Sequence, residues 1–286
     1  MNQKEALKYY ADTVEEIKEA GLFKAEAPYV SPQGAYIVME NGEKLLNMCA
    51  NNYLGLGNDK RLIEAALFSP EWIPLMGEYL HIPSFASVCY YFMAHMNEKF
   101  DDKKRAVIAR YTPLSEDELN LGAFDLAWFR SAHESIGEED FDLIYDAAKY
   151  ISDGAKHSRA RKYADAALGR LDADETEKAV SAKRNKDLLM AYALIPLKGE
   201  DDIFRRYLYI RKFRKESRQF GAQRAASEEK AAEMALTNLA INAGYSDTVR
   251  LTLRMETKAI DDSRALLEEQ MIEGVSFKIE LDENGR

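Results

Sequence analysis

Apolar residues recur at helical spacing through most of this 286-residue chain. Near its start, Leu7, Val14 and Ile17 fall on one face of a helix that the spacing predicts from Lys4 to Ala20. The sequence from Ser115 to Glu118 has the form of a capping box, in which a hydroxyl and a carboxylate each meet a free backbone N–H group. The pattern therefore predicts a mainly α-helical protein.

The other helical segments follow one another with short turns, as in a helical bundle or a solenoid-like helix stack. The segment 225–243 is apolar on nearly all sides between Ala231 and Ala243, so we expect it at the centre. Further helices are predicted at residues 59–67, 141–151, 156–170, 174–183, 186–195, 201–217 and 247–258.

Strand signals lie near the two ends of the chain. Residues 35–40 and 43–47 are predicted to form short strands joined by Asn41-Gly42, which is a strong hairpin signal. Residues 275–281 alternate between apolar and polar side chains and predict a single strand. The expected architecture is a mainly α bundle or helix stack, with a short β-hairpin near the N-terminus and one C-terminal strand.

The formal net charge of -10 argues against attraction of the whole protein to nucleic acid or to acidic membranes. The two cysteines, Cys49 and Cys89, make no disulfide framework and fit a reduced, cytoplasmic setting. The stretch from Tyr79 to Asn97 has no formally charged residue but contains a proline and two histidines, so it predicts a buried core helix and no membrane span. We expect a cytoplasmic protein without a membrane partner.

The run from Asn47 to Leu56 reads Asn-Met-Cys-Ala-Asn-Asn-Tyr-Leu-Gly-Leu and sits in a wider frame of matching order and spacing. In this frame, residues 13–66 resemble the N-terminus of glycine C-acetyltransferase, also called 2-amino-3-ketobutyrate coenzyme A ligase, a pyridoxal-phosphate enzyme of the α-oxoamine synthase family. The resemblance implies the entry to an aspartate-aminotransferase fold. It also implies that Asn51 lies near the carboxylate of the amino-acid substrate, to which its amide would donate.

The rest of that enzyme has no counterpart in the sequence. Its family needs a Schiff-base lysine, an acidic partner for the pyridinium nitrogen, a stacking histidine and a glycine-rich phosphate site. After Ala66 the chain continues with Leu67 to Trp72 where the glycine-rich stretch is expected, and helices replace the βαβ alternation of a large parallel sheet. We therefore predict no catalytic residue and no cofactor; pyridoxal phosphate is implied only if the chain is an enzyme fragment.

A second resemblance begins at about Phe68. Residues 68–286 resemble an internal region of the bacterial domain-of-unknown-function 4132 family, which is related to the molybdate-metabolism regulator and has no established activity. Together the resemblances predict an incomplete acetyltransferase-like segment at residues 1–66 and a helical domain at residues 67–286, without a flexible linker between them. The second resemblance is carried by residues 90–96, 119–125, 219–224 and 238–245.

Basic residues interleaved with aromatic ones crowd the segment 205–224, a pattern that serves phosphate binding and base stacking. The alternative is a helix with a buried aromatic stripe and a solvated basic face, which the helical spacing of Tyr207, Ile210 and Phe213 favours. The candidate residues for an anion or nucleic-acid patch are Arg211, Arg214, Lys215 and Arg218.

We expect several other polar residues to stabilise the fold and not to form a functional site. Asn238 and Asn242 lie four apart in an apolar helix and are expected to tie neighbouring loops together; lining a polar pocket is the alternative. The pairs Glu138-Glu139 and Glu228-Glu229 are expected at helix starts, where carboxylates favour the helix dipole. No histidine has a partner at metal-ligand spacing, so no metal site is predicted. The four histidines are His81, His95, His133 and His157.

Three hypotheses for function follow. The first is a non-catalytic helical scaffold that binds a protein partner and carries an incomplete acetyltransferase-like segment. The second is a glycine C-acetyltransferase fragment that transfers an acetyl group from acetyl-CoA to glycine only when another chain supplies the missing parts. The third is a nucleic-acid-associated regulator acting through the basic segment 205–224.

Overall fold

In the computed structural model, the residues described are 3–23, 29–31, 36–47, 62–151, 156–268, 270–273 and 275–278. The chain divides into two compact units, Met1–Lys60 and Arg61–Arg286. This division lies N-terminal to α2 (Leu62–Phe68), whose residues Ala66 and Leu67 are buried in the core of the second unit. The boundary expected at residue 66 from the two resemblances therefore lies inside a packed helix, and the domain division at that point stays a prediction.

The first unit contains the predicted hairpin. Strand β1 (Tyr36–Val38) pairs antiparallel with β2 (Lys44–Leu46), with Tyr36 opposite Leu46. The turn between them is stabilised by Asn41, whose side chain accepts a hydrogen bond from the Glu43 backbone N–H at 2.9 Å. Gly42 supplies the positive φ of +83° that the turn needs. The predicted hairpin and its turn residues are confirmed.

The predicted N-terminal helix is also confirmed, as α1 (Gln3–Glu19). Its apolar stripe is exposed, with Leu7 65% accessible to solvent and Val14 and Ile17 each more than a third exposed. An isolated helix of this length is marginal in water, and most helices gain stability by burying such a stripe. Within the described residues, α1 therefore has an amphipathic pattern but no buried face.

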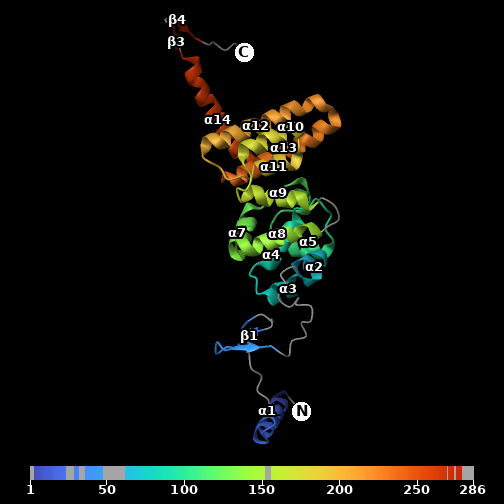
Figure 1. The fold of residues 1–286 in the computed structure, drawn as a ribbon. Coiled ribbons are helices and arrows are strands. Elements are labelled where there is room, and N and C mark those ends of the chain that lie inside the picture. Colours follow the sequence, from blue (N-terminus) through green and yellow to red (C-terminus); the bar gives the residue numbers. More distant parts are fainter. Residues whose placement is uncertain are drawn as a thin grey trace. The chain divides into compact units, whose positions relative to one another are not determined.

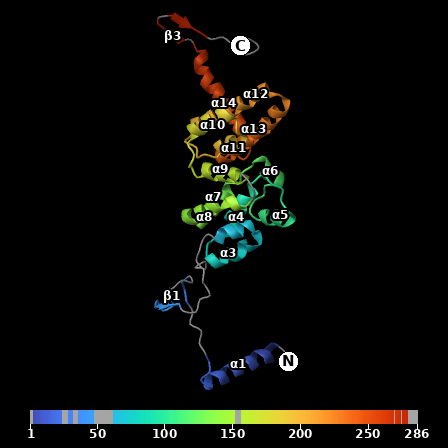
Figure 2. The same ribbon diagram turned by 45° about the vertical axis from the view of Figure 1, so that its right-hand side comes forward.

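The second unit is a succession of helices joined by short connections, with α2 to α8 gathered in one part and α10 to α14 in the other (Figures 1 and 2). The mainly α fold class is confirmed. After α2 come η2 (Pro70–Trp72), α3 (Ile73–Leu80), α4 (Phe85–Ala94), α5 (Asp102–Ile108), α6 (Glu116–Leu121), α7 (Leu126–Ile136), α8 (Glu138–Ala147), η3 (Ala148–Tyr150), α9 (His157–Ala167), α10 (Ala173–Lys183), α11 (Lys186–Tyr192), α12 (Glu200–Ser217), η4 (Arg218–Phe220), α13 (Ala222–Asn242) and α14 (Thr248–Leu267).

Helix α4 forms the core of the first part of this stack, as expected for the uncharged stretch around it. Its residues from Val88 to Ala94 are all buried, and α3, α7, α8 and α9 pack against it. The Tyr91 ring lies 4.9 Å from Phe129 and 5.9 Å from Phe124, measured between ring centres, in an aromatic cluster. No helix in the described part of the chain is long and apolar enough to cross a membrane.

Helix α13 is central to the second part of the stack, as predicted. It packs against α11 and α12 on its flanks and also contacts α6 and α14. Its buried face consists largely of alanines, which let neighbouring helices approach closely. The buried residues of α13 are Glu228, Ala231, Ala232, Ala235, Asn238, Leu239 and Ala240.

Polar side chains tie the ends of these helices together. Arg159 on α9, 5% exposed, donates from Nε to the His95 carbonyl at 3.1 Å and from Nη1 to the Asn120 carbonyl at 2.8 Å. Both carbonyls lie at helix C-terminal ends, where no intrahelical N–H is available. Arg159 thereby joins α4 and α6 to α9. The capping box predicted at Ser115 and Glu118 is present at the start of α6.

Asn238 and Asn242 act as the predicted ties. The buried Asn238 amide accepts from the Phe124 N–H at 3.2 Å and donates to the Gly122 carbonyl at 3.1 Å, which holds the α6–α7 connection against α13. Asn242 donates to the carbonyls of Ala193 and Ile195, each at 3.0 Å. Their interpretation as structural residues is confirmed.

The C-terminal region departs from the prediction. Strand β4 (Val275–Phe277) lies in the expected segment, but it pairs antiparallel with β3 (Gln270–Ile272), which the sequence pattern did not predict. The predicted single strand is therefore half of a hairpin. Because β3 has only three residues, it is too short to show the alternation on which a strand prediction depends.

Replacement of Asn238 by leucine tests the tie between α13 and the α6–α7 connection. The change keeps the number and branching of the side-chain heavy atoms but removes the hydrogen bonds of the buried Phe124 N–H and Gly122 carbonyl to the amide. We expect a loss of about 2–4 kcal/mol in the free energy of unfolding, measured by urea denaturation. Thr237→Val, at a half-buried neighbouring position, serves as the control. A variant as stable as the wild type would show that this tie contributes nothing.

Candidate functional site

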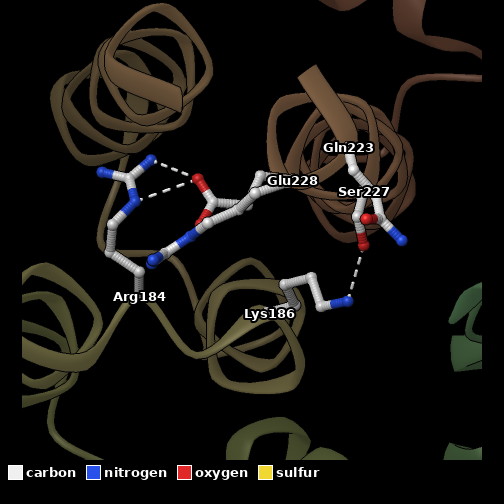
Figure 3. Close-up of a pocket in the computed structure, with 6 residues that line it drawn as sticks. Arg184, Lys186, Gln223, Ser227 and Glu228 are labelled. Atoms are coloured by element: carbon white, nitrogen blue, oxygen red, sulfur yellow. Dashed lines mark hydrogen bonds and ion pairs between the residues drawn. The ribbon is translucent and has the colours of Figure 1, made fainter. Parts of the chain in front are cut away.

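A cavity of about 310 Å³ opens where the connection between α10 and α11 meets the first two turns of α13. Arg184 follows the last residue of α10, and Lys186 is the first residue of α11. Between them, Asn185 caps α11 by accepting from the Leu188 N–H at 2.9 Å. We call this cavity the cationic pocket (Figure 3); its lining residues are Arg184, Lys186, Gln223, Arg224, Ser227 and Glu228.

The innermost contact of the cationic pocket is an ion pair between Arg184 and Glu228. Arg184 Nη2 and Nε donate to Glu228 Oε2 at 2.7 and 3.0 Å (Figure 3). The Arg184 and Glu228 side chains are 9% and 3% exposed, so the pair is almost entirely removed from water. Arg184 reaches this position with a left-handed backbone, at φ +49°, which a non-glycine residue rarely adopts.

Helix α12 completes the environment of Glu228. Ser217 Oγ donates to Glu228 Oε2 at 2.7 Å, and Arg184 Nη2 also donates to the Phe213 carbonyl at 2.9 Å. Burial alone would raise the pKa of the Glu228 carboxyl, but the hydrogen bonds from Arg184, Ser217 and Arg224 outweigh it and lower the pKa to about 2. Glu228 is therefore ionised at neutral pH, and with so low a pKa its carboxylate is too weak a base for efficient general-base catalysis there.

In the outer part of the cationic pocket, two cationic side chains use only some of their N–H groups for hydrogen bonds with the described residues. Arg224 donates from Nε to Glu228 Oε1 at 2.8 Å, and its side chain is 49% exposed. Lys186 Nζ donates to Ser227 Oγ at 2.7 Å. With three cations and one carboxylate, the lining carries a net charge of +2. Such a lining favours the binding of an anion.

The predicted patch on the basic segment 205–224 is partly neutralised. Arg211 pairs with Glu256 on α14, and Arg214 pairs with Glu229 on α13. Lys215 and Arg218 are exposed and have no ion pair with a described residue. The structure therefore does not gather the four predicted residues into one free cationic surface, and their role in binding stays a prediction.

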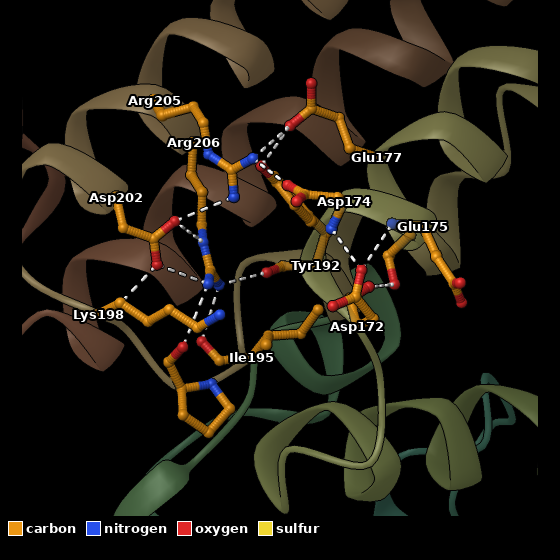
Figure 4. Close-up of polar contacts among 12 residues, drawn as sticks. Asp172, Asp174, Glu175, Glu177, Tyr192, Ile195, Lys198, Asp202, Arg205 and Arg206 are labelled. Atoms are coloured by element: carbon orange, nitrogen blue, oxygen red, sulfur yellow. Dashed lines mark hydrogen bonds and ion pairs between the residues drawn. The ribbon is translucent and has the colours of Figure 1, made fainter.

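The aromatic stripe of the same segment is buried, as predicted by the alternative interpretation of a helix with a buried aromatic face. Tyr207, Ile210 and Phe213 face the core. The expected solvated basic face is incomplete, because Arg206 is fully buried and pairs with Asp202 at 2.8 Å. Figure 4 shows that Arg206 also points at main-chain carbonyls at the end of α11, donating to Tyr192 at 3.0 Å and Ile195 at 2.8 Å.

Glu228 was expected at the start of a helix, and this prediction is wrong. Helix α13 begins at Ala222, so Glu228 lies in its second turn and faces the core. By contrast, Glu138 and Glu139 do lie in the first turn of α8. The sequence prediction also missed Arg184 and Lys186, although basic residues between two predicted helices were a signal for them.

Among the N-terminal candidates, Asn51 and Cys49 lie outside the described residues. Cys89 is fully buried, and burial raises the pKa of its thiol, so it is no nucleophile. No group of three His, Cys, Asp or Glu side chains within the described residues could hold a metal ion.

His95 is the one fully buried histidine of the described residues. Its Nδ1 donates to the Tyr91 carbonyl at 2.9 Å, while Nε2 has no hydrogen-bond partner among the described residues. Burial lowers the pKa of His95 to about 4; the Tyr91 hydrogen bond opposes this shift and the nearby charge of Arg159 adds to it. His95 is therefore neutral in the folded protein near pH 7.

Stability is expected to depend on His95 in mildly acidic solution. Because its folded-state pKa of about 4 lies below the ordinary 6.5, the unfolded chain takes up the proton first. The contribution is complete above pH 6.5 and is lost as pH falls towards 4, for a total of about 3 kcal/mol. Denaturation at several pH values should show that, between pH 4 and 6.5, the free energy of unfolding of His95→Asn changes less steeply with pH than that of the wild type. An unchanged slope would contradict the assignment.

Glu228→Gln tests the buried ion pair at lower pH. Its folded-state pKa of about 2 lies below the ordinary 4.5, so its contribution is present above pH 4.5 and is lost as pH falls to about 2. At pH 7 the variant leaves Arg184 buried without its carboxylate, and we expect a loss of about 3 kcal/mol in the free energy of unfolding. The adjacent Glu229→Gln breaks only an exposed pair and should change stability little; equal losses would contradict the buried pair.

Comparison with known proteins finds partial similarity to two kinds of α-oxoamine synthase. The 8-amino-7-oxononanoate synthase of Thermosipho melanesiensis is 46% identical over 57 residues, which are 20% of this chain and 14% of that protein. That of Fervidobacterium nodosum is 48% identical over 59 residues, 21% of this chain and 15% of that protein. The 2-amino-3-ketobutyrate coenzyme A ligase of Salmonella typhimurium is 31% identical over 160 residues, 54% of this chain and 36% of that protein.

These relatives confirm the expected similarity as a partial one, because the chain spans only 14% to 36% of their lengths. The match to the ligase covers more than half of this chain and so extends past residue 66, where the resemblance was expected to end. No solved structure matches the chain.

A family model also matches, over residues 41–255, and is described as a family of unknown function, DUF5724. It covers most of the helical unit and begins within the segment that resembles the acetyltransferase. The resemblance to the domain-of-unknown-function 4132 family is not shown and stays a prediction.

Proposed function

The chain belongs to the DUF5724 family of unknown function, and we propose that it serves as a non-catalytic helical binding module. Its site is the cationic pocket, through which it recognises an anionic group on a protein partner. The observation that carries this proposal is the arrangement of charge, with three cations around one cavity whose carboxylate is already held by two of them.

The chemistry of the cationic pocket supports binding without catalysis. Its carboxylate has a pKa of about 2 and accepts hydrogen bonds from Arg184, Ser217 and Arg224, so it has no tendency to take up a proton at neutral pH. Ser227 has a lysine as its hydrogen-bond partner, which supplies positive charge but does not orient a general base against the hydroxyl. The lining can therefore hold an anion, but it lacks the paired nucleophile and base of an acyl-transfer site.

The described residues do not fit pyridoxal phosphate as α-oxoamine synthases use it. That chemistry needs a lysine in an enclosed pocket, but none of the described lysines is buried. It also needs a large parallel sheet, whereas the strands described form two-stranded antiparallel hairpins. We therefore derive no reaction step through this cofactor.

A turnover assay tests the absence of catalysis. The purified chain is incubated with pyridoxal phosphate, glycine and acetyl-CoA, and free coenzyme A is measured with a thiol reagent. We expect no thiol beyond that of the chain's own Cys49 and Cys89. An intact ligase serves as the positive control. Glycine-dependent release of many equivalents of coenzyme A would overturn the proposal.

A second candidate function has one observation in its favour. Identities of 46–48% over nearly sixty residues with 8-amino-7-oxononanoate synthases suit a segment that could replace the N-terminus of such an enzyme. In this candidate, Asn51 would meet the substrate carboxylate in a complex with a second chain. The same assay decides it when a 2-amino-3-ketobutyrate coenzyme A ligase that lacks its first sixty or so residues is added. Restored turnover that Asn51→Ala abolishes would establish the fragment.

A further inference from the structure

We propose that the cationic pocket binds a phosphomonoester group, carried by a phosphorylated protein side chain or by a small phosphorylated molecule. This inference rests on the proposed binding function and names the ligand class. The pocket volume of about 310 Å³ lies at the lower end of small-molecule sites, about 300–1,000 Å³. The volume therefore suits one compact charged group and the few atoms that carry it.

Arg184 lines the base of the pocket, but nearly all of its N–H groups already donate to acceptors within the protein. Its Nε and Nη2 groups donate to Glu228, and Nη2 also donates to the Phe213 carbonyl and to Ser217. Nη1 donates to Glu216 at 3.2 Å. Arg184 therefore contributes fixed positive charge at the base of the cavity, and the donors that contact a ligand must come from other residues.

Arg224 has a guanidinium edge, formed by its two terminal nitrogens, that is free to bind a ligand. Only its Nε donates to Glu228, and no described residue accepts from its two terminal nitrogens. The bond to Glu228 fixes the inner end of the side chain, and the Phe220 ring lies 4.4 Å from the guanidinium carbon. A guanidinium held at one edge presents the other edge to two oxygens of a phosphate, the geometry in which arginine binds this group best.

The other free donors lie on the opposite part of the lining. Figure 3 shows Lys186 pointing at Ser227, with the Gln223 side chain beside them. Lys186 uses one of its three N–H groups on Ser227, and the Ser227 hydroxyl hydrogen and the Gln223 amide donate to no described residue. Arg224, Gln223 and Ser227 all belong to the first two turns of α13, so the positive end of that helix dipole adds to their field.

Charge selects a phosphomonoester over other anions. The lining has a net charge of +2, and a phosphomonoester carries about -1.5 to -2 near pH 7. A carboxylate or the phosphodiester of a nucleic acid carries only one negative charge, so it leaves half of the positive charge uncompensated. The pocket therefore matches a terminal phosphate group better than a nucleic-acid strand.

Isothermal titration calorimetry tests this assignment on the full chain. The probes are inorganic phosphate, glycerol 3-phosphate, a phosphoserine peptide, the same peptide with glutamate, and single-stranded DNA. We expect the phosphomonoesters to bind at least tenfold more tightly than the glutamate peptide. A preference for the phosphoserine peptide would identify a protein as the source of the group, and equal affinity for glycerol 3-phosphate would identify a small molecule.

Two variants locate the binding. Arg224→Gln and Lys186→Gln should each weaken phosphomonoester binding at least tenfold, while Lys215→Gln, which removes the same charge from an exposed position of α12, should change it less than twofold. Circular dichroism confirms that each variant is folded. Binding that survives both pocket variants, or absence of phosphomonoester binding, overturns the inference.

The outcome also separates this inference from the proposed function. DNA or the glutamate peptide binding through Arg224 and Lys186 more tightly than a phosphomonoester would overturn the ligand class and leave a non-catalytic anion-binding module. The non-catalytic part of the proposed function falls only by turnover in the coenzyme A assay, and its anion-binding part falls if none of the probes binds. Because pyridoxal phosphate is itself a phosphomonoester, its binding alone counts as ligand binding and not as evidence of catalysis.

Discussion

The buried carboxylate of Glu228 sets the arrangement of the helices around the cationic pocket. A charge this deep costs several kcal/mol unless opposite charge and hydrogen bonds compensate it. Arg184, from the connection between α10 and α11, and Ser217, from α12, provide that compensation, and Arg184 takes a left-handed backbone to do so. The same contacts that satisfy Glu228 fix the guanidinium of Arg224 at the edge of the cavity. Stability and the candidate site therefore have one physical origin.

The same requirement, that buried polar groups be paired, explains how so many short helices hold together. Each helix leaves carbonyls without partners at its C-terminal end. Arg159 and Arg206 meet such carbonyls at the ends of α4, α6 and α11, and Asn242 does so beyond α11. These side chains connect helices that are neighbours in space, and not only helices that follow one another in the chain. Most of the polar residues that stood out in the sequence pair with other groups of the protein in this way. The cationic pocket differs because some donors in its lining have no such partner among the described residues.

Local patterns were enough to predict most of the helices, though not α3, α5 or α7, and also the capping box at Ser115 and the hairpin at Asn41-Gly42. Each of these features depends on residues a few positions apart. The pocket depends on residues that the sequence separates widely. Arg184 and Glu228 are 44 residues apart, and nothing local pairs them. Because the start of α13 was predicted three residues late, Glu228 was assigned to a helix start and to the helix dipole, and its role in a buried ion pair was missed. The charges were visible in the sequence, but their partners were not.

The contacts of Asn238 affect the order in which parts of the chain fold during synthesis. Its amide pairs with Gly122 and Phe124, more than a hundred residues earlier in the chain. A nascent chain that ends before α13 contains every residue of α2 to α9, yet the connection between α6 and α7 still lacks the side chain that closes it. The connection between α6 and α7 therefore reaches its final hydrogen bonding only after α13 has left the ribosome. During synthesis, one backbone N–H and one carbonyl of this connection lack their hydrogen bonds to Asn238 until a helix made much later arrives.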